Sequence, residues 1–180
     1  MPSLTGRPLL ALPVSEKVIY EQPLNERIRA FLRLEFLFEQ VRHHVAGTTP
    51  WDSRAGLASL LDIMSIFGRS DLKSEVMKEL ERHTSNLARL EQNPDVDRAQ
   101  LSHLLDEMDT LIDLLHAHNG PVGAQLKTNE FLAAIQQRSS IPGGLCDFDL
   151  PAFHFWLERP AEERLKDLCS WLNTFDVIGR

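Results

Sequence analysis

Apolar residues recur every three or four positions through residues 23–45, and this spacing predicts one long amphipathic helix. The main stripe comprises Leu24, Ile28, Phe31, Leu34, Phe38, Val41 and Val45. Leu32, Phe36 and Leu37 widen the stripe, so we expect the helix to pack against more than one neighbour. Pro23 suits the first turn of this helix, where its missing N–H group costs nothing.

Further segments show the same helical spacing, and residues that commonly end helices separate most of them. Their expected ranges are 54–67, 71–90, 97–117, 129–138, 150–158 and 160–178. Ser70 and Asp149 are placed to cap the helices that follow them. Trp156 and Trp171 share helical spacing with apolar neighbours and are expected in the core. Together the segments predict an α-helical bundle, in which the second to fourth helices bury their apolar stripes against the first.

The first residues of the chain lack helical periodicity. Residues 1–16 contain three prolines and no long apolar core, so we expect a flexible arm there. Val18, Ile19 and Tyr20 form a short β-branched and aromatic run, which predicts a β-strand leading into the first helix. Residues 17–180 are therefore expected to form one mainly α-helical domain with a short N-terminal strand.

Length, cysteine content and charge narrow the class of protein. A chain of 180 residues can bury a core without disulfide bonds, and its two cysteines, Cys146 and Cys169, fit a reducing compartment. No window approaches the roughly 18 apolar residues that a membrane span needs. The start of the chain does not resemble a signal peptide, so we expect a cytoplasmic protein without membrane insertion. The net charge of −7 argues against non-specific nucleic-acid binding.

The charges are unevenly distributed along the chain, which allows a cationic surface on an acidic protein. Residues 95–118 carry six acidic residues against Arg98 alone, whereas residues 23–45 carry four arginines against three glutamates. Arg29 and Arg33 lie one helical turn apart, an arrangement that favours an anion-binding surface over a purely structural face. The candidate cationic site comprises Arg29, Arg33, Arg69, Lys73, Arg138 and His154. For each of these residues taken singly, the alternative is an ordinary solvated side chain.

Other candidate chemistry is sparse. A metal site built from the seven histidines is the alternative hypothesis, but His116 and His118 lie two residues apart and point to different faces of a helix. Asp147 and Asp149 would suit a cation, although Asp149 is favoured as a helix cap. The sequence contains no phosphate-binding loop, nucleophile elbow, Cys-x-x-Cys or His-Glu-x-x-His motif. We therefore expect no enzymatic activity, no cofactor and no metal.

Two long stretches carry a family resemblance. One is residues 18–37, with the sequence VIYEQPLNERIRAFLRLEFL, and the other is residues 138–157, with the sequence RSSIPGGLCDFDLPAFHFWL. Residues 60–62 and 69–82 also fit. Together these stretches resemble the ZapD family, the Z-ring-associated cell-division proteins of Gram-negative bacteria. The resemblance runs from about residue 18 to the end of the chain.

This resemblance implies a non-enzymatic function in cell division. Members of the family have a helical domain followed by a β-rich domain, and they form dimers. They bind the C-terminal tail of FtsZ, the bacterial tubulin homologue, through a basic pocket. The dimer cross-links FtsZ filaments and so stabilises the Z-ring at mid-cell during septation. The matching stretches contain all six residues of the candidate cationic site: Arg29, Arg33, Arg69, Lys73, Arg138 and His154.

The chain departs from the family pattern in two places. Family chains continue past residue 180 into the β-rich domain, which would take up the predicted strand at residues 18–20. We expect that domain to be absent here, and the 180-residue chain to fold as a helical module that bundles FtsZ poorly. Residues 129–131 read Asn-Glu-Phe where the family tends to be basic, so the pocket is expected to be weaker or shifted. The FtsZ cross-linker is the main hypothesis, and a metal-binding helical bundle is the alternative.

Overall fold

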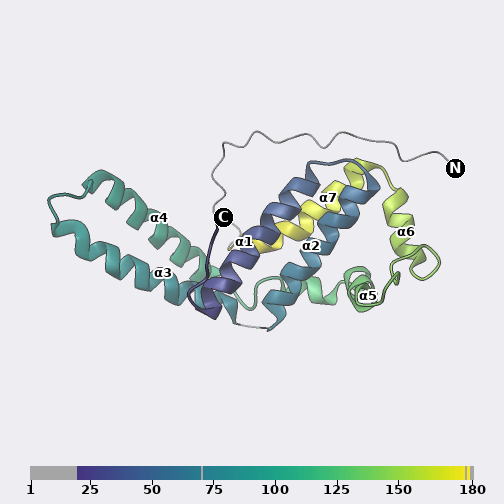
Figure 1. Cartoon of the computed structure of the whole chain (residues 1–180), viewed down its shortest axis with the longest axis horizontal. Helices are drawn as coiled ribbons and strands as arrows, with labels where there is room; N and C mark the ends of the chain where they lie inside the picture. The colour runs from purple at the N-terminus through teal and green to yellow at the C-terminus, as the bar shows by residue number, and fades with distance from the viewer. Residues whose placement is uncertain (1–19, 70, 177, 179–180) are drawn as a thin grey trace.

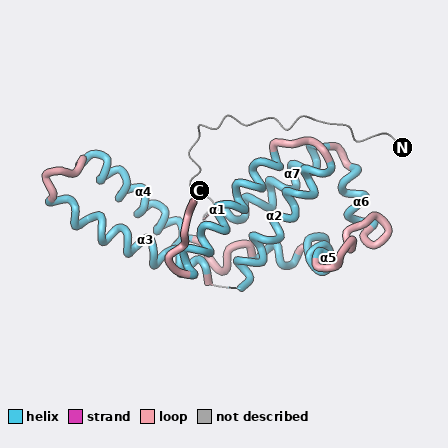
Figure 2. The backbone as a smooth tube through the Cα atoms, in the orientation of Figure 1, coloured by secondary structure: helices cyan, strands magenta, loops and turns pink. Residues whose placement is uncertain are grey.

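The computed structural model of the chain describes residues 20–69, 71–176 and 178, and of Arg69 only the backbone. Figure 2 shows this part as helices joined by loops, with no strand in it. The α-helices are α1 (Glu26–Val45), α2 (Pro50–Arg69), α3 (Leu72–Ala88), α4 (Arg98–Ala117), α5 (Glu130–Ser139), α6 (Pro151–Glu158) and α7 (Ala161–Leu172). The 3-10 helices are η1 (Arg89–Gln92), η2 (Ala124–Thr128) and η3 (Asn173–Phe175). The mainly helical prediction is confirmed.

The predicted N-terminal strand is not seen. Val18 and Ile19 lie outside the described residues, as does the predicted arm at residues 1–16, and Tyr20 belongs to no strand. The first helix also begins later than predicted, since Leu24 lies before it and is 90% exposed.

An asparagine sets the start of α1. The side-chain oxygen of Asn25 accepts a hydrogen bond of 2.9 Å from the N–H of Ile28, which satisfies one otherwise unpaired donor of the first turn. Pro23 therefore lies before the helix and not in its first turn.

Helices α1, α2 and α7 form the centre of a helical body, with α5 and α6 at one end of it (Figure 1). α1 packs mainly against α2, and α2 also contacts α6 and α7. Each of these helices contributes side chains to one apolar core, and Val41, Leu60, Leu132, Phe153 and Leu168 are fully buried examples. Burying one such side chain contributes roughly 1.5–3 kcal/mol, so this core is the main source of stability for the body.

The two tryptophans lie in this core, as predicted. Trp156 is buried and stacks against the partly buried Trp171, with ring centroids 6.0 Å apart. Phe131 lies within 5.9 Å of both rings. The indole N–H of Trp156 donates to Asp167 at 2.9 Å, so burial leaves no polar atom of that ring unpaired.

Helices α3 and α4 form an antiparallel hairpin that projects away from the body (Figure 1). The prediction that the second to fourth helices pack against the first is therefore wrong for α4 and for the outer part of α3, whereas Leu72 and Val76 at the start of α3 pack in the core of the body. Leu101, Met108 and Leu115 of α4 are buried, yet they are not part of the core cluster of the body. Leu90, the last residue of the predicted third helix, lies in η1 and is 40% exposed. Spacing shows which face of a helix is apolar but not which helix covers it, and this explains the error.

Two predicted helix caps are also wrong. α3 is capped by Asp71, whose carboxylate accepts from the backbone N–H and the hydroxyl of Ser74, whereas Ser70 lies outside the described residues. No side chain caps α6, because its N-cap residue is Leu150 and Asp149 faces other partners. α2 begins at Pro50, earlier than the predicted residue 54. Thr49 and Asp52 exchange hydrogen bonds there in the manner of a capping box.

Candidate functional site

The six residues of the candidate cationic site lie in three parts of the structure. Arg29 and Arg33 lie on the first half of α1, Arg69 and Lys73 flank the junction of α2 and α3, and Arg138 and His154 belong to α5 and α6. The first half of α1 lies beside the base of the hairpin, where Arg27 pairs with Glu79 of α3 at 2.9 Å. Figure 1 shows α5 and α6 at the opposite end of the body. The structure therefore places Arg138 and His154 on either side of one loop, each facing an aspartate of that loop, and places Arg29 and Arg33 elsewhere.

A loop of successive tight turns joins α5, which carries Arg138, to α6, which carries His154. The N–H groups of Ile141, Gly144 and Cys146 each donate to the carbonyl three residues earlier, at 2.9–3.0 Å. Gly143 has a φ of +73°, and a Cβ atom on Gly144 would lie 2.6 Å from the carbonyl oxygen of Arg138. Side chains at these two positions would strain or displace the loop, so the Gly-Gly pair fixes its path.

The loop places one carboxylate beside Arg138 and another beside His154, which is a cation only when it is protonated. Arg138 lies 3.5 Å from Asp149, and Nδ1 of His154 lies 3.2 Å from Asp147. Asp149 also accepts a contact of 3.2 Å from the thiol of Cys146. The four charged side chains are 39–66% exposed, and ion pairs this open to water contribute little to stability. A bound peptide carboxylate can therefore replace these aspartates at small cost.

An open hollow of about 600 Å³ adjoins this pair, between the start of α2 and residues 139–146. Trp51 forms one wall and is 75% exposed. The guanidinium carbon of Arg54 lies 5.5 Å from the ring centroid of Trp51 and 4.8 Å from that of Phe153. Its Nη1 donates to the carbonyl of Leu145 at 3.1 Å. Sequence reasoning missed Arg54, and the one available signal was that Trp51 fits no apolar stripe.

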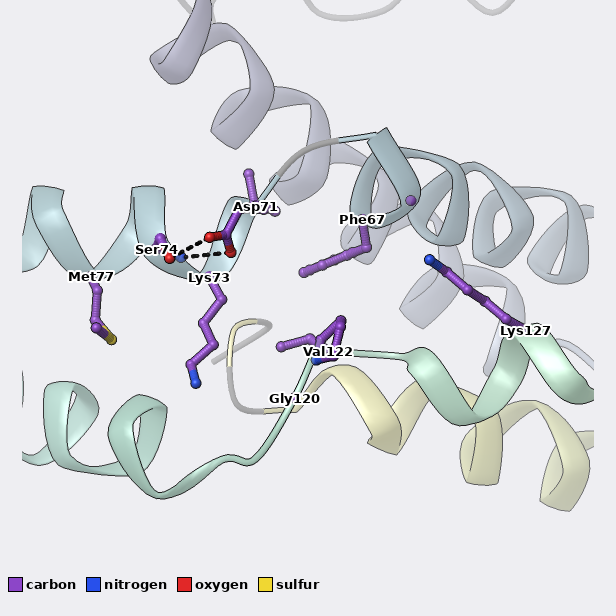
Figure 3. Close-up of a pocket in the computed structure, with 11 residues that line it drawn as sticks. Phe67, Asp71, Lys73, Ser74, Met77, Gly120, Val122 and Lys127 are labelled. Carbon is purple, nitrogen blue, oxygen red and sulfur yellow. Dashed lines mark hydrogen bonds between the residues drawn. The ribbon is translucent and has the colours of Figure 1, made fainter.

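Lys73 lines a second hollow of about 600 Å³, at the base of the hairpin. Figure 3 shows Lys73 and Lys127 on either side of it, with Phe67 and Val122 between them. The ammonium of Lys73 donates to the carbonyl of His118 at 2.7 Å, which ties α3 to the end of α4. The two ammonium groups flank an apolar floor, so an anionic peptide would also fit this place.

The arginines of α1 lie on its polar side. Arg29 pairs with Glu26 at 3.4 Å within the helix, and Arg33 is exposed.

The neighbouring Arg27 takes part in an ion-pair network that the sequence did not indicate. Arg82 and Arg27 both donate to Glu79 and lower the pKa of that carboxyl from its ordinary 4.5 to about 2.

The described residues support neither a metal site nor a membrane-spanning helix. Among them, no three His, Cys, Asp or Glu side chains are placed to hold a metal ion. His44 instead lies 4.0 Å from Asp52, whose pKa is lowered mainly by the hydrogen bond from the Thr49 hydroxyl. No helix in the described ranges has the length and apolarity needed to cross a bilayer.

Comparison with known proteins identifies a family. The family described as "ZapD: Cell division protein" matches residues 32–180. Cell division protein ZapD of Methylococcus capsulatus is 43% identical over 165 residues, which cover 92% of this chain and 65% of the relative. The ZapD proteins of Aromatoleum aromaticum and Cupriavidus pinatubonensis are 43% and 42% identical over 86% of this chain. The chain spans 60–65% of the length of these relatives.

Proposed function

The chain belongs to the ZapD family of cell division proteins, and from this premise we propose that it binds the C-terminal tail of FtsZ and cross-links FtsZ filaments. Cross-linking would stabilise the Z-ring at the division site in the cytoplasm, without an enzymatic step and without nucleic acid. The observation that carries the proposal is the turn-rich loop between α5 and α6, which is flanked by the exposed side chains of Arg138 and His154 and lines an open hollow. Exposed cations beside an apolar surface suit a peptide that carries both carboxylates and apolar side chains.

Cross-linking needs two tail sites in one assembly, so a homodimer is part of the proposal. The projecting hairpin supports it. Leu90, Leu104 and Leu114 remain 40–41% exposed there, because α3 and α4 cover each other on one side only. Two such hairpins would bury these leucines in a four-helix bundle, the usual way for helices to cover a wide apolar stripe.

A titration of a fluorescent FtsZ tail peptide tests the binding step. We expect Arg138→Glu to raise the dissociation constant about tenfold, since it turns an attraction for a carboxylate into a repulsion. His154→Glu should also raise it, since it removes a hydrogen-bond donor and adds a negative charge. Arg98→Glu makes the same charge change at the start of α4, on the hairpin, and serves as the control. Equal affinity in all four proteins would remove Arg138 and His154 from the tail site.

A further inference from the structure

The hairpin of α3 and α4 is a unit of its own. Its two helices pack mainly against each other, and Leu101, Met108 and Leu115 of α4 are buried outside the core of the body. At the base, the ammonium of Lys73 donates to the carbonyl of His118 at 2.7 Å, which ties the start of α3 to the end of α4. The hairpin therefore keeps its own shape independently of the angle at which it leaves the body.

Two short connections join the hairpin to the body, namely residues 70–71 before α3 and residues 118–123 after α4. The second contains Gly120, which has a φ of +80° and would have no atom within 4 Å of an added Cβ atom. A glycine in open space restricts its backbone less than any other residue would. The connections alone therefore do not set the angle of the hairpin.

Open space flanks the base of α3. One space is the hollow next to Lys73, shown in Figure 3, and the other is a groove of about 550 Å³ between α1 and α3, lined by Phe31 and Leu80. Interiors normally leave few voids, and close packing of side chains holds neighbouring helices at one angle. Of the described residues of α3, Leu72 and Val76 pack in or against the core of the body. Apolar packing thus fixes the hairpin at one point and leaves its angle to other contacts.

An ion-pair network joins α1 to the hairpin beyond that point. Arg27 of α1 donates to one carboxylate oxygen of Glu79 at 2.9 Å, and Arg82 donates to the other oxygen at 2.9 Å. The Glu79 side chain is 13% exposed, so salt screens this contact less than a pair at the open surface. Glu79 follows Leu72 by two helical turns, or about 10 Å along α3. A contact at that distance from the fixed point limits rotation of the hairpin.

We propose that Arg27 and Glu79 are positioning residues, which hold the hairpin at one angle and thereby set the separation of the two FtsZ-tail sites in a dimer. This inference rests on the proposed function, in which hairpins form the dimer interface and bodies bind the tails. α4 has 20 residues and spans about 30 Å, so a rotation of about 10° at the base would move the far end of the hairpin by about 5 Å. The ion pair would thus keep the separation of the tail sites uniform.

Distances between two spin labels, measured by pulsed electron paramagnetic resonance, test this role. One label replaces Gln92 at the far end of the hairpin and the other replaces Ser170 of α7, both exposed, in a chain whose Cys146 and Cys169 are changed to Ser. Dilution with unlabelled protein leaves labels in one copy of each dimer. We expect a single narrow distance distribution in wild type and a distribution about twofold wider or more in Glu79→Gln.

Matched variants separate positioning from general stability. Glu81→Gln, an exposed neighbour on α3, should keep the narrow distribution. Arg27→Gln should widen it as Glu79→Gln does, whereas Arg27→Lys keeps the charge and should restore most of the narrow distribution. Far-UV circular dichroism should show all four variants folded. A distribution in Glu79→Gln as narrow as in wild type would overturn the proposal.

A second measurement asks whether the ion pair sets the separation of the tail sites. One label on Ser140, next to Arg138, in each copy of the dimer reports the distance between the two sites. We expect Glu79→Gln to widen this distribution at unchanged affinity for the FtsZ tail peptide. Widening within one copy but not between copies would overturn the role in site separation.

The two measurements also separate this inference from the proposed function. Absence of a distance between copies in wild type would overturn the dimer and, with it, the role in site separation. Failure of wild type to bind the tail peptide would overturn the proposed function, while the label pair within one copy would still show whether Arg27 and Glu79 hold the hairpin.

Discussion

Among the described residues, Arg164 of α7 is the one charged residue that is buried, with 4% exposure. Its guanidinium donates to the hydroxyl of Ser53 at 3.0 Å and to the carbonyls of Leu157, Arg159 and Thr48. These acceptors lie at the start of α2, at the end of α6 and in the turns that precede α2 and α7. Arg164 therefore joins two chain reversals that are more than a hundred residues apart in the sequence.

Replacing Arg164 by Met should lower the free energy of unfolding by about 3 kcal/mol. The thioether fills part of the space but leaves the carbonyls and the Ser53 hydroxyl without their donor. Urea unfolding followed by circular dichroism measures the change. Lys166→Met, an exposed position on the same helix, is the control and should change stability by less than about 0.5 kcal/mol. Equal free energies of unfolding for the two variants would show that the hydrogen bonds of Arg164 contribute little to stability.

Glu79 gives a prediction about pH. Its side chain is 13% exposed, and Arg82 and Arg27 lower its pKa from 4.5 to about 2. A carboxyl whose pKa is lowered by folding stabilises the protein above its unfolded pKa, and that stabilisation is lost as the pH falls toward the folded value. The stability difference between wild type and Glu79→Gln should thus be largest near neutral pH and shrink between pH 4.5 and about 2. Glu81→Gln, an exposed neighbour, should show no such trend in the same urea experiment.

At the scale of elements, the hairpin of α3 and α4 yields a prediction about self-association. Leu104→Lys places a charge on an exposed apolar position and should raise the dimer dissociation constant at least tenfold. Helical content should stay the same, because Leu104 is not among the buried residues of α4. Analytical ultracentrifugation measures the change, with the neighbouring Ser102→Lys as the control. Unchanged association of Leu104→Lys would place the dimer interface outside the hairpin.

The sequence predicted the elements better than their packing. Spacing located the ends of the α-helices to within four residues, because amphipathicity is a local property of the chain. The exception is α7, which was predicted to reach residue 178 but ends at Leu172. It could not show that α3 and α4 pair with each other, since Leu101 and Leu104 look alike until a neighbouring helix covers one of them. Caps were misjudged where two polar residues competed, as at Asp71, and where Asp149 faces Arg138 and Cys146 and not the first turn of α6.

In the candidate site, too, sequence spacing could predict neighbours along the chain but not contacts between distant segments. Arg138 and His154 flank one loop and face aspartates of that loop, so a local pattern could find them. The hollow joins Trp51 to a loop about ninety residues further along the chain, and no spacing rule connects those segments. Tertiary structure alone reveals that Arg54 lies between the rings of Trp51 and Phe153.

At the scale of the whole molecule, the net charge of −7 bears on how the proposed binding of the FtsZ tail would occur. An acidic protein that binds an anionic segment must rely on a few local cations, so affinity should fall as ionic strength rises past ~0.15 M, where the Debye length is about 8 Å. Titrations of the tail peptide at increasing salt concentration measure how steeply its affinity falls with salt. This fall should be less steep for Arg138→Glu than for wild type. An affinity insensitive to salt would mean that the apolar hollow alone carries recognition.

The central claim is that this chain recognises FtsZ through the FtsZ tail. Co-sedimentation with polymerised FtsZ tests it most directly, with full-length FtsZ and FtsZ lacking its C-terminal tail compared at the same polymer mass. We expect the chain to pellet with full-length filaments and to stay in the supernatant with tail-less filaments. Equal pelleting with both kinds of filament, or pelleting with neither, would contradict tail recognition.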